Sequence, residues 1–232
     1  MPDDPSERAF TQMAKRLQRV RQPAQMFAAL RWGLEELDRV YAATAPSVLH
    51  TVACRAGCDA CCHGPVDVQA HEVFYAADHI QRHFAPQALD DLISRLERHR
   101  ERIAALAAGE RDRVRQPCAL LSAGACSIYA ARPQPCRAHH TNNATTCHAH
   151  RDDPSVDIAA AYIPALRARM FAVMLSVDAA VEFAGYDDRA YDFGCALHEA
   201  LTNRLCLEAW MRQEPAFSDA CLADRDDASG SS

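Results

Sequence analysis

The most restrictive feature of this sequence is a block of four thiols within nine residues, Cys54-Arg55-Ala56-Gly57-Cys58-Asp59-Ala60-Cys61-Cys62. A chain with such a block must use the sulfurs as metal ligands, pair them as disulfides or bury them. The adjacent Cys61 and Cys62 do not bridge each other without strain. The chain holds eleven cysteines, an odd number. The block therefore favours metal ligation over a disulfide framework.

The start of the chain bears on the state of these thiols. Its first ten residues, MPDDPSERAF, are acidic and lack the apolar core of a secretory signal peptide. We therefore expect a cytoplasmic protein, in a compartment that keeps thiols reduced. Clustered thiols in a reducing compartment are more often metal ligands or redox groups than structural disulfides.

Charge and hydropathy argue against two classes of partner. The formal net charge is −6, so no global basic field attracts nucleic acid or an anionic membrane surface. The most apolar helical stretch, 158–181, contains Arg167, Arg169 and Asp178, so it is not expected to span a bilayer. We expect neither a nucleic-acid partner nor a membrane association.

Apolar residues at spacings of three and four predict a mainly α fold. Residues 6–45 are expected to be helical, and Pro23 suits the first turn of a helix. Another helix is predicted from Pro86 to a C-cap near Gly109. The apolar stripe of the first arm consists of Met26, Leu30, Leu34, Leu37 and Tyr41. The remaining predicted helices cover 67–84, 158–181, 192–203 and 204–212.

The segment 118–129, CALLSAGACSIY, has a different pattern. Short apolar pieces flank Ser122-Ala123-Gly124, which predicts a small β-hairpin with glycine at the turn. Residues 138–154 are polar and are expected to form a loop. The fold class predicted from these patterns is a mainly α single helical domain around a cysteine-cluster metal site, with a small β-hairpin.

We divide the chain into four predicted segments. They are an N-terminal helical arm (1–46), a cysteine-cluster metal-binding domain (47–150), C-terminal helices that pack on it (151–222) and a disordered tail (223–232).

The spacing within the cysteine block suits a soft or borderline metal. Zinc and iron–sulfur clusters bind thiolates, typically four around one centre. Cys58 and Cys61 are spaced so that both sulfurs can face one metal from a tight loop. One helical turn between Cys54 and Cys58 would place their sulfurs on the same side. Cys62 must point elsewhere than Cys61, toward a second metal or into a buried position.

A second group of cysteines follows in the hairpin region. The hairpin returns Cys126 toward Cys118, and Pro133 and Pro135 hold Cys136 at a defined angle. The predicted metal ligands of both groups are Cys54, Cys58, Cys61, Cys62, Cys118, Cys126, Cys136 and Cys147.

The two motifs CRAGCDACC and PCALLSAGACSIYAARPQPCR together resemble the YkgJ-type cysteine-cluster family, which is named for zinc or iron chelation. The resemblance covers about residues 54–137. It implies ligation by the first seven of the predicted cysteines, and it makes Tyr129, Arg132 and Arg137 signature neighbours of the cofactor. Guanidinium groups beside an anionic thiolate centre would stabilise it. The cofactor is either an iron–sulfur cluster or Zn²⁺, because four thiolates give a net charge of −2 with Zn²⁺ and with [4Fe–4S]²⁺ alike.

The remaining cysteines and the histidines have competing interpretations. Cys195 and Cys206 are expected to be buried thiols, and Cys221, next to the tail, an exposed one. His63 is either a ligand or a donor to a thiolate. Most other histidines, including His99, are expected to lie on helix faces without a special role. Four histidines either add imidazole to a mixed centre or lie in a polar surface loop: His139, His140, His148 and His150.

Three functions remain open at this level. The first is a metal-binding cysteine-cluster protein that holds an iron–sulfur cluster or zinc. The second is a metal- or cluster-dependent modifying enzyme, since the cysteine block is also similar to that of flagellin lysine-N-methylases, which implies methyl transfer to a protein side chain. It would act on a protein partner or an acidic substrate. The third is a thiol–disulfide redox protein that uses Cys58 and Cys61.

Overall fold

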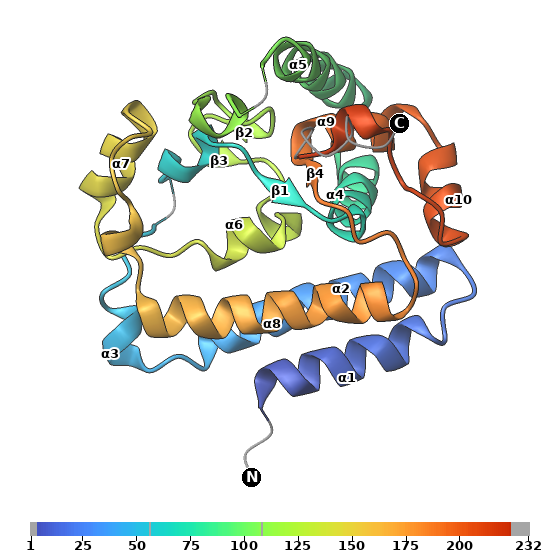
Figure 1. Ribbon diagram of the computed structural model, residues 1–232, viewed down its shortest axis with the longest axis horizontal. Helices are drawn as coiled ribbons and strands as arrows, with labels where there is room; N and C mark the ends of the chain where they lie inside the picture. Colours follow the sequence, from blue (N-terminus) through green and yellow to red (C-terminus); the bar gives the residue numbers. More distant parts are fainter. Residues whose placement is uncertain (1–3, 56, 108, 224–232) are drawn as a thin grey trace. The chain divides into compact units, whose positions relative to one another are not determined.

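The computed structural model describes residues 4–55, 57–107 and 109–223 of the 232-residue chain (Figure 1). It is 63% helical, with ten α-helices and two two-stranded sheets in the described part. The predicted mainly α fold with a small β-hairpin is therefore confirmed. The predicted tail, 223–232, lies outside the described residues except for Ala223. None of the helices in the described ranges has the length and apolar character needed to cross a membrane.

The chain divides into two compact units. The first contains the described residues of Met1–Cys61 and Gln134–Tyr186, and the second those of Cys62–Pro133 and Asp187–Ser232. The chain passes from one unit to the other at three points, and the first of these falls between the adjacent cysteines Cys61 and Cys62. The four predicted segments of the chain stay a prediction.

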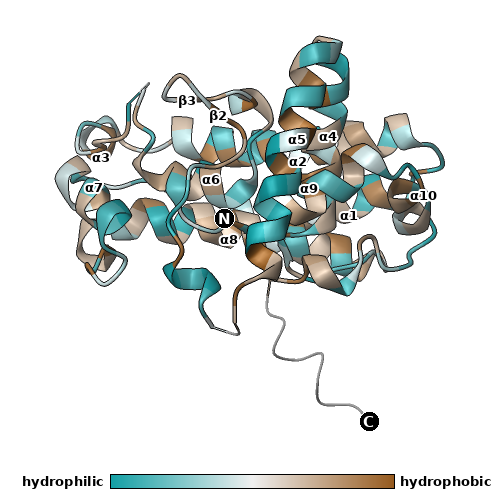
Figure 2. Ribbon diagram, turned by 90° about the horizontal axis from the view of Figure 1, so that it is seen from above, coloured by the Kyte–Doolittle hydropathy of each residue, from teal (hydrophilic) through white to brown (hydrophobic). Residues whose placement is uncertain are grey.

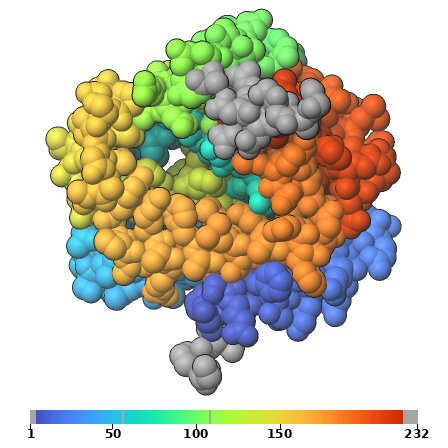
Figure 3. All heavy atoms as spheres, in the orientation of Figure 1, coloured from blue at the N-terminus to red at the C-terminus, as the bar shows by residue number. Residues whose placement is uncertain are grey.

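The first unit is built on three long helices: α1 (Pro5–Leu17), α2 (Pro23–Ala42) and α8 (Pro164–Phe183). Each helix packs on the other two, and Figure 3 shows the atoms of α1 in contact with those of α8. The predicted helical region 6–45 contains two long helices: α1 ends at Leu17, and α2 begins at Pro23, the residue expected in the first turn of a helix. The shorter helices of this unit are α3 (Pro46–Leu49), α6 (Gln134–Ala138) and α7 (Ala144–Asp152).

Close helix packing in the first unit depends on Gly33. A Cβ atom at this position would lie 3.2 Å from Cγ1 of Val177, so the missing side chain lets α2 approach α8. The predicted helix over 158–181 begins later, at Pro164, because residues 159–161 form a single 3₁₀ turn and Ile163 is extended. The predicted stripes are otherwise core, and their buried members are Met26, Leu30, Leu34, Leu37, Leu166, Met170, Val173, Val177 and Val181.

The second unit is built around α9 (Phe193–Thr202), on which α4 (Ala70–His83) and α5 (Pro86–Ala104) pack. The helix α10 (Leu205–Met211) also contacts α9. The buried side of α5 carries Leu92, Leu96 and Ile103, and Figure 2 shows hydrophilic residues along its visible side. The prediction that α5 extends to Gly109 is wrong, because the helix ends at Ala104.

Two small sheets complete the second unit. The predicted hairpin is formed by β2 (Leu121–Ser122) and β3 (Ala125–Cys126). Its turn residues Ala123 and Gly124 both have positive φ, 50° and 74°, a combination typical of a type I′ turn. The other sheet was not predicted: β1 (Asp67–Val68) pairs antiparallel with β4 (Tyr191–Asp192), and strands of two residues leave no alternating pattern in the sequence.

Candidate metal centre

All eleven cysteines lie in the described part of the chain, where each is a thiol. Cys54 and Cys61 are exposed, and Cys58 is half-buried. The predicted helical turn between Cys54 and Cys58 is wrong. The chain instead turns through Gly57, whose φ of +80° favours glycine, and the amide of Cys58 donates to the carbonyl of Arg55 at 3.0 Å. A 3₁₀ turn, η1 (Ala60–His63), follows and carries Cys61 and Cys62.

Backbone pairing fixes the segment around Thr141 beside the cysteine block. The amide of Ala53 donates to the carbonyl of Thr141 at 2.8 Å. On its other side, Thr141 forms an antiparallel bridge with Tyr162, and the amide of Asn142 donates to the carbonyl of Ala161 at 2.9 Å. Thr141 is therefore held from two sides. One of its partners, Ala53, is the residue before Cys54.

The hydroxyl group of Thr141 connects two of the predicted ligands. Its oxygen lies 3.0 Å from the sulfur of Cys147 and 3.9 Å from the sulfur of Cys54. The Thr141 side chain is buried, with a residue exposure of 1%. Cys147, which the sequence placed far from the first block, thus lies next to it in the structure.

Cys147 is carried by α7, so the prediction of a loop over 138–154 is wrong. Asn143 caps this helix, because its side-chain oxygen accepts from the amide of Thr146 at 3.1 Å. Cys147 is the buried residue of the helix, at 7% exposure. The cap and the burial of one thiol stabilise this short helix, which the polar sequence by itself does not predict.

A second contact links α7 to the cysteine block. Nη1 of Arg151, one helical turn after Cys147, lies 3.8 Å from Oδ1 of Asp59, which lies between Cys58 and Cys61. Burial raises the pKa of the Cys147 thiol, and the hydrogen bond with Thr141 opposes that rise. Three further thiolate charges raise the same pKa: those of Cys54, Cys58 and Cys61.

The histidines near α7 have contacts of their own. The rings of His139 and Tyr162 meet edge to face at 5.4 Å, and that of His140 stacks on Tyr41 at 4.6 Å. Nδ1 of His150 lies 2.7 Å from the carbonyl oxygen of Val156. Burial, and then the charges of Arg167, His140 and His150, lower the pKa of His139 to about 4. His139 is therefore neutral at pH 7.

The other predicted ligands are held by different contacts. In the second unit, the amide of Cys118 donates to the carbonyl of Cys62 at 2.8 Å, and Cys126 pairs with Leu121 in the hairpin. Cys136 lies on α6 of the first unit. That both groups of cysteines complete a single site stays a prediction.

The three predicted cofactor neighbours have identifiable partners. The guanidinium of Arg132 lies 3.8 Å over the ring of Tyr129 and donates to the Tyr129 carbonyl at 3.0 Å. Arg137 is buried, and its Nη1 lies 2.9 and 2.8 Å from the two carboxylate oxygens of Asp38. A structural role accounts for these contacts, and a role toward the cofactor stays a prediction.

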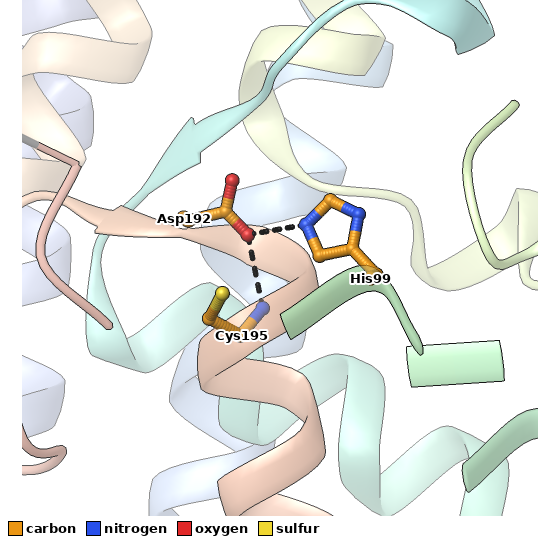
Figure 4. A group of neighbouring side chains, drawn as sticks. All are labelled: His99, Asp192 and Cys195. Atoms are coloured by element: carbon orange, nitrogen blue, oxygen red, sulfur yellow. Dashed lines mark hydrogen bonds and ion pairs between the residues drawn. The ribbon is translucent and has the colours of Figure 1, made fainter. Parts of the chain in front are cut away.

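A cluster in the second unit was missed by sequence reasoning, which gave His99 no role. Nε2 of His99 donates to Oδ1 of Asp192 at 2.7 Å, and the amide of Cys195 donates to the same oxygen at 2.9 Å (Figure 4). Oδ2 accepts from Nε and Nη2 of Arg111 at 3.1 and 3.0 Å. Nε2 of Gln116 lies 2.9 Å from Nδ1 of His99. We call this set the Asp192 brace.

The Asp192 brace resembles a metal site only in part. Ligand atoms of His99, Asp192 and Cys195 lie within 4.8 Å of one another. However, each carboxylate oxygen of Asp192 already accepts two hydrogen bonds, and the Arg111 guanidinium adds a positive charge. The brace is therefore a satisfied hydrogen-bond network that joins α5 to the N-terminus of α9.

A small cavity, partly open to solvent, adjoins the Asp192 brace. Its walls include the polar residues Arg111 and Gln116, the apolar Leu96 and Phe193, and the predicted ligand Cys118. The cavity thus lies beside one of the cysteines that the motifs single out.

The cysteines outside the motifs are buried. The expected burial of Cys195 and Cys206 is confirmed, with exposures of 1% and 5%. The expectation that Cys221 is exposed is wrong, because its exposure is also 1%. The chain folds back there: the amide of Ala223 donates to the carbonyl of Ala190 at 3.0 Å.

The chemistry of the first thiol group fits a thiophilic metal. A tetrahedral site of four thiolates is a typical zinc centre, and four cysteines also hold a common iron–sulfur cluster. The group offers four thiols, those of Cys54, Cys58, Cys61 and Cys147. The buried hydroxyl of Thr141 and the guanidinium of Arg151, which pairs with Asp59 and Asp152, lie beside them.

Residues 53–154 match the family model CxxCxxCC, described as "Putative zinc- or iron-chelating domain". This segment, less than half of the chain, is similar to the CxxCxxCC family. The resemblance inferred from the motifs is thereby confirmed, and the CxxCxxCC segment contains all eight predicted ligands. The family name has two residues between its first two cysteines, whereas this chain has three between Cys54 and Cys58. No curated protein matches the chain, and no solved structure matches it.

Proposed function

We propose that this chain is a metal-binding cysteine-cluster protein whose thiolates hold an iron–sulfur cluster or zinc. One observation carries the proposal: Cys147, distant in sequence, shares the buried Thr141 hydroxyl with Cys54, and the charges of Cys58 and Cys61 also act on its thiol. The CxxCxxCC match supports it independently. The proposed ligands are the eight cysteines of the two groups, from Cys54 to Cys147. We further propose a cytoplasmic location, because that compartment keeps thiols reduced.

A bound metal would change what these thiols do. Zinc closed by four thiolates would stabilise the fold, and an iron–sulfur cluster would add electron transfer. In either case the thiols bind as thiolates, so loading releases protons and is favoured by rising pH.

The cavity beside Cys118 favours a second candidate, a metal- or cluster-dependent modifying enzyme. Such an enzyme would need a cofactor or substrate in this cavity, and methyl transfer to a protein side chain is one reaction of this class. A thiol–disulfide redox function of Cys58 and Cys61 is the third candidate.

Anaerobic purification followed by metal analysis and an absorption spectrum tests the proposal. Several irons per chain with a broad visible band would support an iron–sulfur cluster, and stoichiometric zinc without colour would support zinc. A chain that contains neither metal and does not take up either after reduction would contradict the proposal. A Cys58–Cys61 disulfide in that chain would favour the redox function instead.

A further inference from the structure

We propose that Cys54, Cys58, Cys61 and Cys147 by themselves form one complete four-thiolate metal centre, in which the hydroxyl of Thr141 donates a hydrogen bond to the Cys147 thiolate. The inference rests on the proposed function and specifies it: it identifies four ligands among eight and adds a positioning residue. The cysteines of the second unit, Cys62 among them, are then outside this centre.

The position of Thr141 supports this centre. Its carbonyl accepts from Ala53, the residue before Cys54, and its bridge with Tyr162 holds the opposite side. The hydroxyl is therefore fixed between two sulfurs, at 3.0 Å from Cys147 and 3.9 Å from Cys54. A valine methyl group in its place would keep the shape and remove the donor.

The contact between Arg151 and Asp59 supports the same centre. Cys147 and Arg151 are four residues apart on α7, so they lie on the same face of the helix. Arg151 reaches the residue between Cys58 and Cys61. The face of α7 that carries Cys147 is thus held against both parts of the cysteine block, at Cys54 through Thr141 and at the CxxC loop through Arg151.

The bonds and protons of such a centre can be accounted for. Zn²⁺ displaces four thiol protons to the solvent and forms four Zn–S bonds, which leaves a complex of net charge −2. A buried anion needs nearby donors or positive charge. Thr141 supplies a hydrogen bond to the buried Cys147 sulfur, and the Arg151 guanidinium, which also pairs with Asp152 at 2.8 Å, lies beside the loop.

The role of Cys62 follows from the chain around it. Its carbonyl is paired with the amide of Cys118, and both residues belong to the second unit. The 3₁₀ turn η1 carries Cys61 and Cys62 as successive residues, so their side chains leave the backbone in different directions. We therefore assign Cys62 to the second group, with Cys118 and Cys126.

The test is a Co²⁺ titration of the reduced, metal-free full-length chain under anaerobic conditions. Co²⁺ replaces zinc in thiolate sites, and the intensity of its sulfur-to-metal charge-transfer band reports the number of thiolate ligands. Cys147→Ser is expected to lose the four-thiolate spectrum. Cys62→Ser is expected to retain it, and Cys206→Ala, which changes a buried thiol elsewhere, is the matched control.

The same titration tests the positioning role. Thr141→Val is expected to shift the charge-transfer band and to weaken Co²⁺ binding by about tenfold to a hundredfold, the usual effect of removing a group that orients a ligand. Thr141→Ser keeps the hydroxyl and is expected to restore both. If Thr141→Val bound Co²⁺ with the wild-type spectrum and affinity, the positioning role would be wrong.

Alkylation footprinting of the wild-type chain gives a test that does not depend on whether the variants fold. Loading with Co²⁺ is expected to protect four cysteines together from alkylation: Cys54, Cys58, Cys61 and Cys147. A four-thiolate spectrum that survives in Cys147→Ser but not in Cys62→Ser would overturn the inference while leaving the proposed function intact. If the wild-type chain bound no metal, the proposed function itself would fail.

Discussion

Nε2 of His99 on α5 lies 2.7 Å from Oδ1 of Asp192, whose side chain is 2% exposed at the N-terminus of α9. Asp192 accepts from Cys195 as the N-cap of α9, and through His99 it also fixes Gln116. The backbone N–H of Gln116 in turn donates to the backbone carbonyl of His63 at 2.8 Å. One buried carboxylate thus stabilises the segments of the second unit that carry Cys62 and Cys118.

Replacement of Gly194 by alanine tests how tightly the His99 ring is held. An added Cβ atom would lie 2.4 Å from Cδ2 of His99, whose two ring nitrogens are both in hydrogen bonds. We expect Gly194→Ala to lower the free energy of unfolding by about 2 kcal/mol in urea titrations, since overpacking outweighs the helix propensity of alanine. The control is Gly64→Ala, where a Cβ atom meets nothing within 4 Å. Equal stability of the two variants would contradict the prediction.

The pH dependence of stability should report Asp192. Burial by itself would raise the pKa of this carboxyl group, but the hydrogen bond and charge of His99, the charge of Arg111 and the amide of Cys195 together hold it well below its usual range. A carboxyl with a lowered folded-state pKa contributes stability above its unfolded pKa of about 3.9, and this stability is lost as the pH falls. We expect Asp192→Asn to lower the free energy of unfolding at pH 7 by about 3 kcal/mol.

The measurement is chemical unfolding of the wild type and Asp192→Asn between pH 7 and pH 3. The difference between them should shrink as the pH falls below about 4, because the wild-type carboxyl then loses its advantage. A difference that stays constant over this range would indicate a role for Asp192 other than its charge.

Arg137 and Asp38 provide a prediction about the signature residues. Arg137 is 4% exposed and Asp38 is 57% exposed at the level of their side chains. We expect Arg137→Ala to lower the free energy of unfolding by about 3 kcal/mol and Asp38→Asn by about 1 kcal/mol, because only the arginine is buried. Urea unfolding measures both. An unchanged stability with an altered metal spectrum in Arg137→Ala would indicate a role toward the cofactor instead.

We expect the thiols of the reduced, metal-free protein to differ in their rates of alkylation. Burial, followed by the charge of Glu199, raises the pKa of Cys206 to about 11 and that of Cys221 to about 12. At pH 8 about one in a thousand of the Cys206 groups is then a thiolate, the form that reacts. We expect iodoacetamide to modify the exposed Cys54 and Cys61 within minutes and to leave Cys206 and Cys221 unmodified, as read by mass spectrometry. Early modification of Cys221 would show that it is accessible.

Much of the fold was predictable because long helices leave a periodic pattern. The stripe from Met26 to Leu37 and the positions of Pro23 and Pro86 located α2 and α5. The hairpin was predictable from Gly124. Short elements were missed for the same physical reason: α7 depends on the cap at Asn143 and the burial of Cys147, and β1 and β4 are too short for a pattern.

The sequence alone indicated the class of chemistry proposed for this protein. Thiols at close spacing mark a thiophilic metal site, and the two motifs indicated the family that the match to residues 53–154 confirmed. The tertiary structure decided which residues meet. No sequence motif singles out Thr141, and Cys147 lies outside the residues 54–137 on which the resemblance rests. Backbone pairing at Ala53 and the helix α7 nevertheless bring both residues to Cys54. Likewise, His99 and Asp192 are 93 residues apart and become partners only when α5 packs on α9. Spacing along the chain records local geometry, whereas contacts between distant segments arise from the packing of whole elements.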